Sequence, residues 1–376
     1  MNPYFVNKYL LLGEQDSKKA VLLLLFALFP FSALLPHAHL CAAAWSALLF
    51  AVGFWVSREK MPSTSQAWLY AAFLALTLSG VVLSTARVAS LISFLLRLSF
   101  FLPLFYEGMK EKMCRLLSLL GGLIGGATLL SLIFGGGVTE YSDPSLFPSL
   151  SRASGFFGNP NVTAVFLLPP ALLSLHALLF AGRGRCFSFL CFFGSLTGIA
   201  ATYSRGALIA LLFAAFLLFA CRFGLIPTLF TLLALLPLLL LLLPSTVTAR
   251  LLSVLSLDTS VFYRFSLWKS IFRLPPRALL FGVGEGKRAM LSALEGVLAG
   301  GLLHVEHTHS LFLHILLAEG LIGLLLFLLL CGRALLSKKG LGARAALLSL
   351  LLFGIFDDPL YSGQTEVLFW LTLGLC

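Results

Sequence analysis

The sequence predicts an all-α membrane protein with about twelve transmembrane helices. Of its 376 residues, 59% are hydrophobic and only 11% are charged, and the mean hydropathy is +1.01. Too few charged groups remain to cover the surface of a water-soluble globule. The apolar residues form runs of about 20 residues, the length that a helix needs to cross a bilayer. A barrel is excluded, because its strands would alternate apolar with polar residues.

Each apolar run predicts one span, and the run at 232–243 consists almost entirely of leucine. The first span is expected to be retained, because no small-residue cleavage site follows it. The predicted spans are 20–36, 39–56, 66–84, 88–106, 116–138, 160–181, 186–203, 206–221, 224–244, 309–331, 345–357 and 363–376.

Basic residues orient these spans. If the N-terminus lies in the cytoplasm, more than half of the 26 Lys and Arg residues fall in cytoplasmic segments, which is the expected bias, and both termini are cytoplasmic. The formal charge of +11 is then explained by attraction to an anionic leaflet, so membrane lipids are expected partners and nucleic acid is not. The seven cysteines lie in spans or near their ends, which indicates no disulfide framework.

Residues 1–376 are expected to form a single integral membrane domain with two longer outer segments. The shorter is 139–159, and the longer, 245–308, separates the ninth span from the tenth and contains short helical stretches. Loops of this length in a compact protein usually carry function. Within the longer segment, Val261–Leu274 predicts an interfacial helix lying on the membrane, with Arg264 and Trp268 on one face.

Four residues at the outer ends of spans are candidates for chemistry: Arg152, Arg205, Arg264 and His309. Any one arginine alone would be interpreted as an interfacial anchor. Three of them near one site would bind a diphosphate, because each guanidinium donates two hydrogen bonds and keeps its charge. His309 alone would be a capping or interfacial residue, but an ordinary pKa of about 6.5 suits it to take a proton from a hydroxyl.

Two further patterns have simpler explanations. His304, Glu306 and His307 suggest zinc, but their spacing matches no established ligand motif, so neither a metal nor a cofactor is expected. The glycines of 282–286 lack the strand and helix that a dinucleotide loop requires, and they indicate a turn between two loop helices.

Ionisable residues inside spans are costly and usually paired. Arg97 and Glu319 are such residues, and we hypothesise that they form an ion pair. Glu319 is ten residues after His309, which places it ~15 Å further along the same helix. Asp357 and Asp358 end the next span on the outer side. Interfacial solvation is the preferred interpretation for them, and substrate contact is the alternative.

At these residues the chain resembles the O-antigen ligase and polymerase family of bacterial inner-membrane glycosyltransferases. Members carry a histidine, a small polar residue, nine positions, a glycine, two positions and a small residue. The same pattern is formed here by His309, Ser310, Gly320 and Gly323. Other phrases follow in the family's order over 152–323: Gly155-Phe-Phe-Gly-Asn-Pro-Asn161, Ser204-Arg205-Gly206, Arg264 with Trp268, and Phe281-Gly-Val-Gly284.

The resemblance implies a GT-C-like layout in the bacterial inner membrane, with the active site on the periplasmic side. It also implies metal-independent, inverting transfer of a glycan from an undecaprenyl diphosphate donor to an acceptor hydroxyl of a lipid or glycan. Glu285 departs from the pattern, since many relatives carry proline there. By this resemblance His309 would be the general base, and Arg152, Arg205 and Arg264 would bind the diphosphate. Further candidates for a supporting role are Asn159, Asn161, Ser310 and Glu319.

Within this family an O-antigen ligase, with lipid A core as acceptor, is preferred. An O-antigen polymerase or a protein O-oligosaccharyltransferase differs only in the acceptor. A secondary transporter is the alternative from another class; its binding groups would lie at mid-membrane, where this chain offers Arg97 and Glu319. A third interpretation, a structural scaffold for an envelope assembly complex, would leave the arginine and histidine sequence motifs unexplained.

Overall fold

The predicted all-α membrane fold is confirmed by a computed structural model. The model describes residues 17–57, 65–83, 87–105, 109–136, 138–143, 147–182, 184–242, 259–295 and 307–376. After the first helical segment, Ser17–Leu34, which ends in η1 (Phe29–Leu34), the helices are α2 (Ala38–Ser57), α3 (Ser65–Leu83), α4 (Arg87–Arg97), η2 (Leu98–Phe101), α5 (Leu102–Phe105), α6 (Lys110–Phe134), η4 (Gly155–Phe157), α7 (Pro160–Phe180), α8 (Arg185–Ala201), α9 (Arg205–Phe223), α10 (Leu225–Leu242), α12 (Thr259–Ile271), α13 (Pro276–Phe281), α14 (Lys287–Leu294), α15 (Leu311–Leu335), α16 (Leu341–Phe356) and α17 (Gly363–Leu375).

Every predicted span coincides with one of these helical segments, the fourth being formed by α4, η2 and α5 together. Seven described helical segments are long and apolar enough to cross a membrane. Shorter apolar helices occur at the predicted spans that contain α3, α8, α10 and α16. The helical segments are therefore found where predicted, and the number of crossings stays a prediction.

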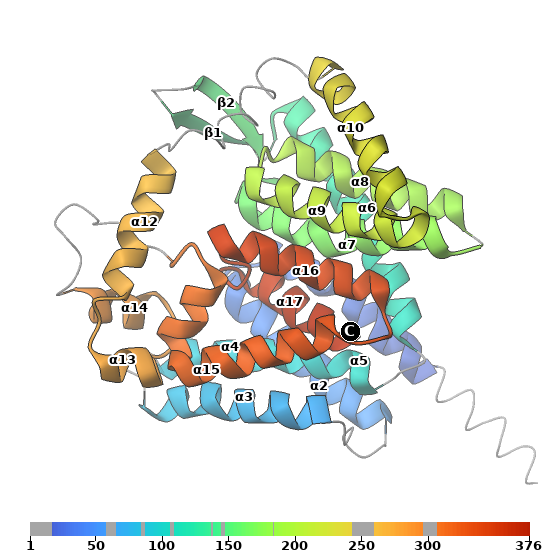
Figure 1. The fold of residues 1–376 in the computed structure, drawn as a ribbon. Helices are drawn as coiled ribbons and strands as arrows, with labels where there is room; N and C mark the ends of the chain where they lie inside the picture. Colours follow the sequence, from blue (N-terminus) through green and yellow to red (C-terminus); the bar gives the residue numbers. More distant parts are fainter. Residues whose placement is uncertain are drawn as a thin grey trace, which may run out of the picture.

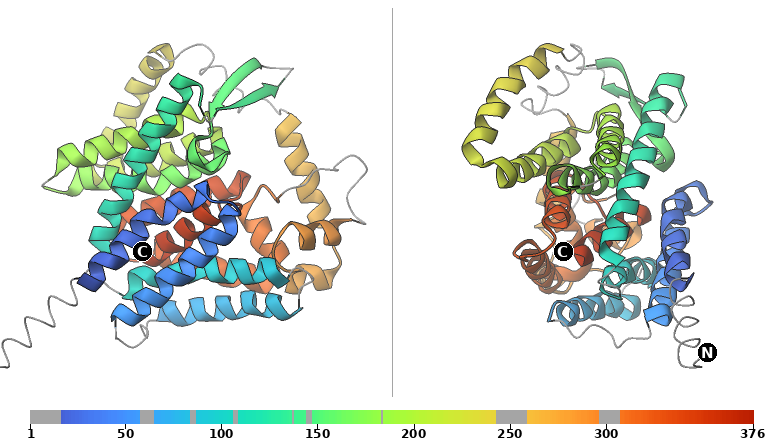
Figure 2. Two further views of the ribbon diagram at one scale, coloured as in Figure 1. Left: turned by 180° about the vertical axis from the view of Figure 1, so that it is seen from behind. Right: turned by 90° about the vertical axis from the view of Figure 1, so that its right-hand side faces the viewer.

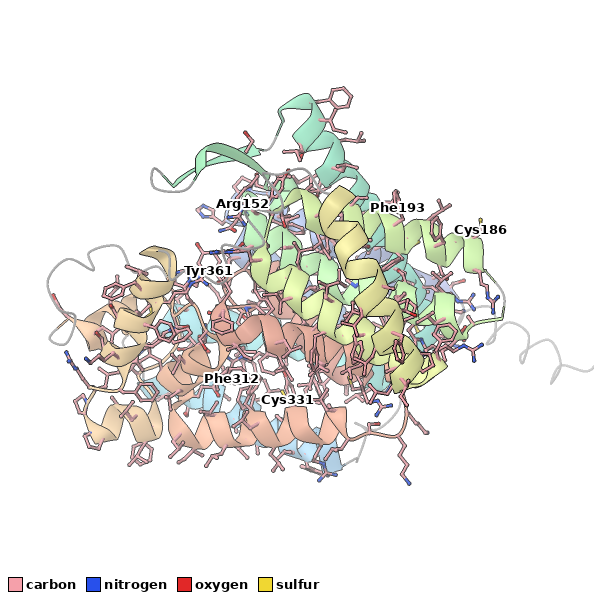
Figure 3. All side chains as sticks on the ribbon, turned by 45° about the horizontal axis from the view of Figure 1, so that its top comes forward. Arg152, Cys186, Phe193, Phe312, Cys331 and Tyr361 are labelled. Carbon is pink, nitrogen blue, oxygen red and sulfur yellow. The ribbon has the colours of Figure 1, made fainter. Side chains whose placement is uncertain are left out.

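The long helices α7, α9, α15 and α16 lie side by side, and two smaller units lie at one end of them. One unit is the hairpin of β1 (Val138–Asp143) and β2 (Phe147–Ala153), and the other is the group α12–α14 (Figures 1 and 2). Arg152 and Tyr361 lie toward this end of the bundle, whereas Cys186 lies toward the other (Figure 3). Both smaller units come from the predicted outer segments.

The core surrounds α17, of which all 13 residues are buried. Other elements therefore cover every side of α17, including its polar residues Gln364, Thr365 and Glu366. Peripheral helices instead expose large apolar side chains, including Phe134, Phe193 and Phe230, as expected for helices that face lipid. α6 and α8 cross closely, because a Cβ on Gly125 would lie 2.1 Å from the carbonyl oxygen of Gly194.

The hairpin is a feature that the sequence interpretation missed. β1 and β2 pair antiparallel, with Thr139 opposite Arg152. Neither strand alternates strictly between polar and apolar residues, since Thr139 and Glu140 are adjacent in β1 and Ser151 and Arg152 in β2, so the usual sequence pattern of a strand is weak here. Two strands alone are marginally stable, so the contacts of β2 with α6 and α8 matter. The hairpin positions Arg152 at the end of the bundle.

Candidate active site

Asp357 is the centre of a polar cluster where α16 ends and α15 begins. α16 ends at Phe356, and the carbonyl of Asp357 accepts a hydrogen bond from the backbone amide of Leu311 at 3.2 Å. Ser310 Oγ donates to the carbonyl of Gly354, at 3.4 Å. These two contacts fasten the start of α15 to the end of α16. Ser310 therefore has a structural role that explains its place after His309.

Two imidazoles face the carboxylate of Asp357. His307 Nε2 lies 3.4 Å and His309 Nδ1 3.6 Å from Asp357 Oδ1. The two rings are close to each other, with centroids 3.9 Å apart. His309 has a φ of 52°, a left-handed conformation that is uncommon for a residue other than glycine and is often retained at functional sites. His309 thus has the carboxylate partner that the sequence did not identify.

Arg264 approaches the same carboxylate from α12. Its Nη2 lies 3.9 Å from Asp357 Oδ2. α12 is held over the site because Trp268 Nε1 donates to the carbonyl of Thr308 at 2.9 Å, one residue before His309. The predicted interfacial helix is therefore packed on the protein as well: Leu267 and Ile271 are buried against side chains of α14 and α15.

Arg152 reaches the cluster through an asparagine. Its Nη2 donates to Asn161 Oδ1, and Asn161 Nδ2 donates to Asp357 Oδ2, both at 2.8 Å. Arg152 Nε donates to the carbonyl of Thr202, at 2.8 Å. Arg205 begins α9 three residues after Thr202. The structure brings Arg152, Arg264 and His309 together around Asp357.

Asn159 caps a helix. Its side chain accepts hydrogen bonds from the backbone amides of Asn161 and Val162, which is the usual role of an asparagine before the first turn. This cap fixes the start of α7 and with it the side chain of Asn161. Of the two asparagines predicted to support the site, Asn161 contacts the cluster and Asn159 orients it.

Glu319 belongs to a second ionic group in the interior of the bundle. It pairs with Arg97, as hypothesised, and it also accepts a hydrogen bond from Thr77 at 2.8 Å. Arg97 is completely buried and contacts two more carboxylates, those of Glu285 and Glu366. The carboxylate of Glu319 is turned to Arg97, and its supporting role at the active site stays a prediction.

His314 connects the interior group to the end of α16. Its Nδ1 lies 2.6 Å from Asp358 Oδ2, and its Nε2 lies 2.9 Å from Glu285 Oε2. Asp357 and Asp358 are both buried. The preferred interpretation of these two residues as solvated at the interface is wrong, because tertiary contacts enclose them. His314 and Glu366 were missed, although each is an ionisable residue in an apolar run.

The family glycines allow a backbone segment to dock on a broken helix. α15 is interrupted at Gly320, which has φ 73° and ψ −174°. Val283 and Gly284 donate backbone hydrogen bonds to the carbonyls of Leu317 and Ala318, at 2.8 and 3.0 Å. A Cβ on Gly320 would lie 2.3 Å from the carbonyl oxygen of Leu280. The segment 281–286 is thus more than the predicted turn. Its backbone hydrogen-bonds to α15 at the interruption and positions Glu285 beside Arg97.

The cluster holds a neutral base beside an anion. Burial lowers the pKa of His309 below its ordinary value, and Asp357 only partly opposes this effect. Burial by itself would raise the pKa of Asp357, but the contacts with His307 and His309 and the charge of Arg264 hold it far below its usual range. At neutral pH His309 is therefore an imidazole that can accept a proton, and Asp357 is a carboxylate that stabilises the resulting imidazolium.

The same three side chains have the proximity needed to bind a metal ion. One ligand atom each from His307, His309 and Asp357 lies within 4.8 Å of the others. Of the residues considered for zinc from the sequence, His304 and Glu306 lie outside the described residues. Metal independence stays a prediction.

Comparison with known proteins supports the resemblance. Residues 190–328 match the family model described as O-antigen ligase. This stretch includes Arg205, Arg264, His309 and the interrupted part of α15. No curated protein and no solved structure matches the chain. The chain is a multi-pass membrane protein, and its residues 190–328, less than half of the chain, are similar to the O-antigen ligase family of glycan-transferring enzymes of the ligase and polymerase kind.

Proposed function

We propose that this protein transfers a glycan from an undecaprenyl diphosphate donor to an acceptor hydroxyl at the periplasmic face of the bacterial inner membrane. Lipid A core is the proposed acceptor, which makes the enzyme an O-antigen ligase. The observation that carries the proposal is the pairing of His309 with Asp357 beside the arginines that contact the same cluster.

The reaction follows from the orientation of the imidazole. Because Nδ1 of His309 faces Asp357, Nε2 is the nitrogen left to take the proton of the acceptor hydroxyl. The acceptor oxygen then bonds to the anomeric carbon, and the bond from this carbon to the diphosphate oxygen breaks. Attack opposite the leaving group inverts the anomeric configuration, and undecaprenyl diphosphate departs with the bonding electron pair. Each step balances with no co-reactant.

The arginines would stabilise the leaving group. Arg264 is partly exposed and lies 3.9 Å from Asp357, so its guanidinium can turn to a diphosphate without breaking a short contact. Arg152 and Arg205 lie on the neighbouring elements β2 and α9. Preorganised positive charge at the departing oxygens is usually a large contribution to catalysis. The apolar outer faces of the bundle suit a donor whose lipid chain stays in the bilayer.

The test is transfer by the purified full-length protein in detergent, with a synthetic undecaprenyl diphosphate oligosaccharide as donor and a chelator present. We expect transfer to fall by about 10²- to 10⁴-fold in His309→Ala, the range of a lost general base. The exposed His37 is the matched control, and His37→Ala should keep wild-type activity. Full activity of a folded His309→Ala protein would refute the base assignment, and loss of transfer only with chelator would refute metal independence.

The acceptor is resolved in the same assay. Lipid A core, a second donor molecule and a pilin-like peptide are offered separately, and product on lipid A core alone is expected for a ligase. Product on one of the others would identify a polymerase or a protein O-oligosaccharyltransferase. The anomeric coupling constant of the new linkage, measured by NMR, reports inversion.

The interrupted α15 is a feature that transporters also use, so transport is the second candidate. Counterflow of a labelled solute or lipid-linked glycan in proteoliposomes, unaffected by His309→Ala, would favour it. We expect no counterflow.

A further inference from the structure

A cavity of about 400 Å³ lies next to the Asp357 cluster, and the proposed reaction assigns no group to it. His307 forms part of its wall, and the His307 ring lies against that of His309. Other parts of the wall come from α4, α14, α15 and α17. Its volume is within the range of small-molecule sites, so it has room for a sugar ring.

The cavity differs in its charged side chains from the side of the cluster where Arg152 and Arg264 lie. Three carboxylates line it, those of Glu285, Asp358 and Glu366, and no Lys or Arg is among its described lining residues. The donor diphosphate would be repelled here and attracted to Arg152 and Arg264. The base therefore lies between a basic side and an acidic side.

Acidic side chains outnumber cations in the buried group that lines the cavity. Both ring nitrogens of His314 face carboxylate oxygens. Each of these oxygens needs an N–H donor, and only the protonated ring carries N–H on both nitrogens, so His314 is an imidazolium. Together with Arg97 this gives two cations for four carboxylates in one buried group: Glu285, Glu319, Glu366 and Asp358. Burial of unpaired negative charge is costly, so the excess is balanced by protons on the carboxyl groups or by a positive or strongly donating ligand that replaces them.

One of these carboxylates has an oxygen available. Glu366 is 2% exposed, and its described hydrogen bonds, from Arg97 at 3.4 Å and Trp370 at 3.3 Å, both use Oε1. Its Oε2 is left to accept from a ligand in the cavity. At another part of the wall, the rings of Tyr361 and His307 lie 4.3 Å apart and offer aromatic surface against which a sugar can pack.

We propose that this cavity is the subsite for the acceptor sugar, and that it takes a ring without negative charge, preferably one that bears an amine. The proposal rests on the proposed function, because it places the acceptor hydroxyl beside His309. Glu366 and Glu285 accept hydrogen bonds from the hydroxyl or ammonium groups of the ring, and a uronic acid is excluded by repulsion.

The experiment measures binding without donor, so its outcome is independent of transfer. Methyl glucosaminide, methyl glucoside and methyl glucuronide are titrated into the full-length detergent-solubilised protein, and saturation-transfer NMR gives the affinities. We expect the amino sugar to bind about tenfold more tightly than the neutral sugar, since one added charge pair in a buried site contributes on this order. The glucuronide should not bind measurably. Equal or tighter binding of the glucuronide would overturn the proposal.

Two variants locate the site. Glu366→Gln should reduce the preference for the amino sugar, because it keeps the shape of the side chain and removes the charge. Ser93→Phe fills the cavity and should abolish binding of both sugars, whereas Ser79→Phe, on an exposed face of α3, is the matched control and should bind as wild type. Unchanged binding by a folded Ser93→Phe protein would overturn the proposal. Binding that persists in His309→Ala while no enzyme form transfers glycan would refute the proposed function and retain the sugar site.

Discussion

The two ionic groups of this protein are built in opposite ways. The cluster around Asp357 has ion-pair distances of 3.4–3.9 Å, partly exposed side chains and a histidine in a left-handed conformation. In the group around Arg97 the guanidinium is completely buried and closely paired, and two of its carboxylates, Glu285 and Glu366, also line the cavity. Long contacts at an accessible end let side chains exchange partners when a substrate binds, whereas closely paired buried charges hold helices in place. The difference indicates chemistry at the first group and a structural role for Arg97 in the second.

The largest effect should come from breaking the interior group. Arg97→Leu leaves three buried carboxylates without their central cation, and removing one partner of a buried ion pair usually costs about 3–5 kcal/mol. We expect little folded protein, measured as the yield of monodisperse protein and its thermal midpoint in detergent. Arg115→Ala is the control, because the Arg115–Glu111 pair is exposed and should contribute little. A stable Arg97→Leu protein would end the distinction between the two groups.

Breaking the outer cluster should remove activity and spare the fold. In Asp357→Asn the imidazole loses the anion that stabilises its charged form, and we expect transfer to fall on the order of 100-fold or more. Thermal unfolding should show a folded protein whose loss of stability is smaller than that of Arg97→Leu. If Asp357→Asn fails to fold while Arg97→Leu folds, the roles of the two groups are reversed.

The interruption of α15 at Gly320 lies between the Asp357 cluster and the Arg97 group, and a substitution of this glycine measures how much the interruption contributes to stability. Gly320→Ala places a Cβ where it meets the carbonyl of Leu280 and requires an unfavourable φ, so we expect a loss of about 1–3 kcal/mol. The measurement is the free energy of unfolding in detergent. Gly126→Ala is the matched control: its Cβ would meet nothing within 4 Å, and a helical Ala should stabilise by about 0.5–1 kcal/mol. Equal effects of the two changes would contradict the docking of segment 281–286.

The smallest effect is a shift in pH dependence. Burial lowers the pKa of His309 from its ordinary value of 6.5, and the base must be neutral, so transfer should rise with pH, reach half its maximum below pH 6.5 and remain high at neutral pH. Asp357 raises the pKa of His309, so in Asp357→Asn this rise should move to still lower pH. The pH profile of kcat/KM measures both. A shift to higher pH in Asp357→Asn would contradict the contact.

The sequence by itself determined the helical membrane fold and the positions of its helices. Long apolar runs suffice for this, because a helix in lipid satisfies its own backbone and needs no distant partner. It also predicted the pairing of Arg97 with Glu319, because isolated charges in a membrane are too costly. The phrases around Arg205, Arg264 and His309 predicted the family.

Only the tertiary structure decided which residues meet. Asp357 became the partner of His309 because the end of α16 is fastened to the start of α15, and these residues are 48 positions apart in the chain. Glu285 joined Arg97 because a glycine segment docks where α15 breaks. Both contacts join residues far apart in sequence, and composition and periodicity describe only local preferences. The family pattern identified the residues for chemistry, and the packing of α15, α16 and α17 brought their carboxylates together.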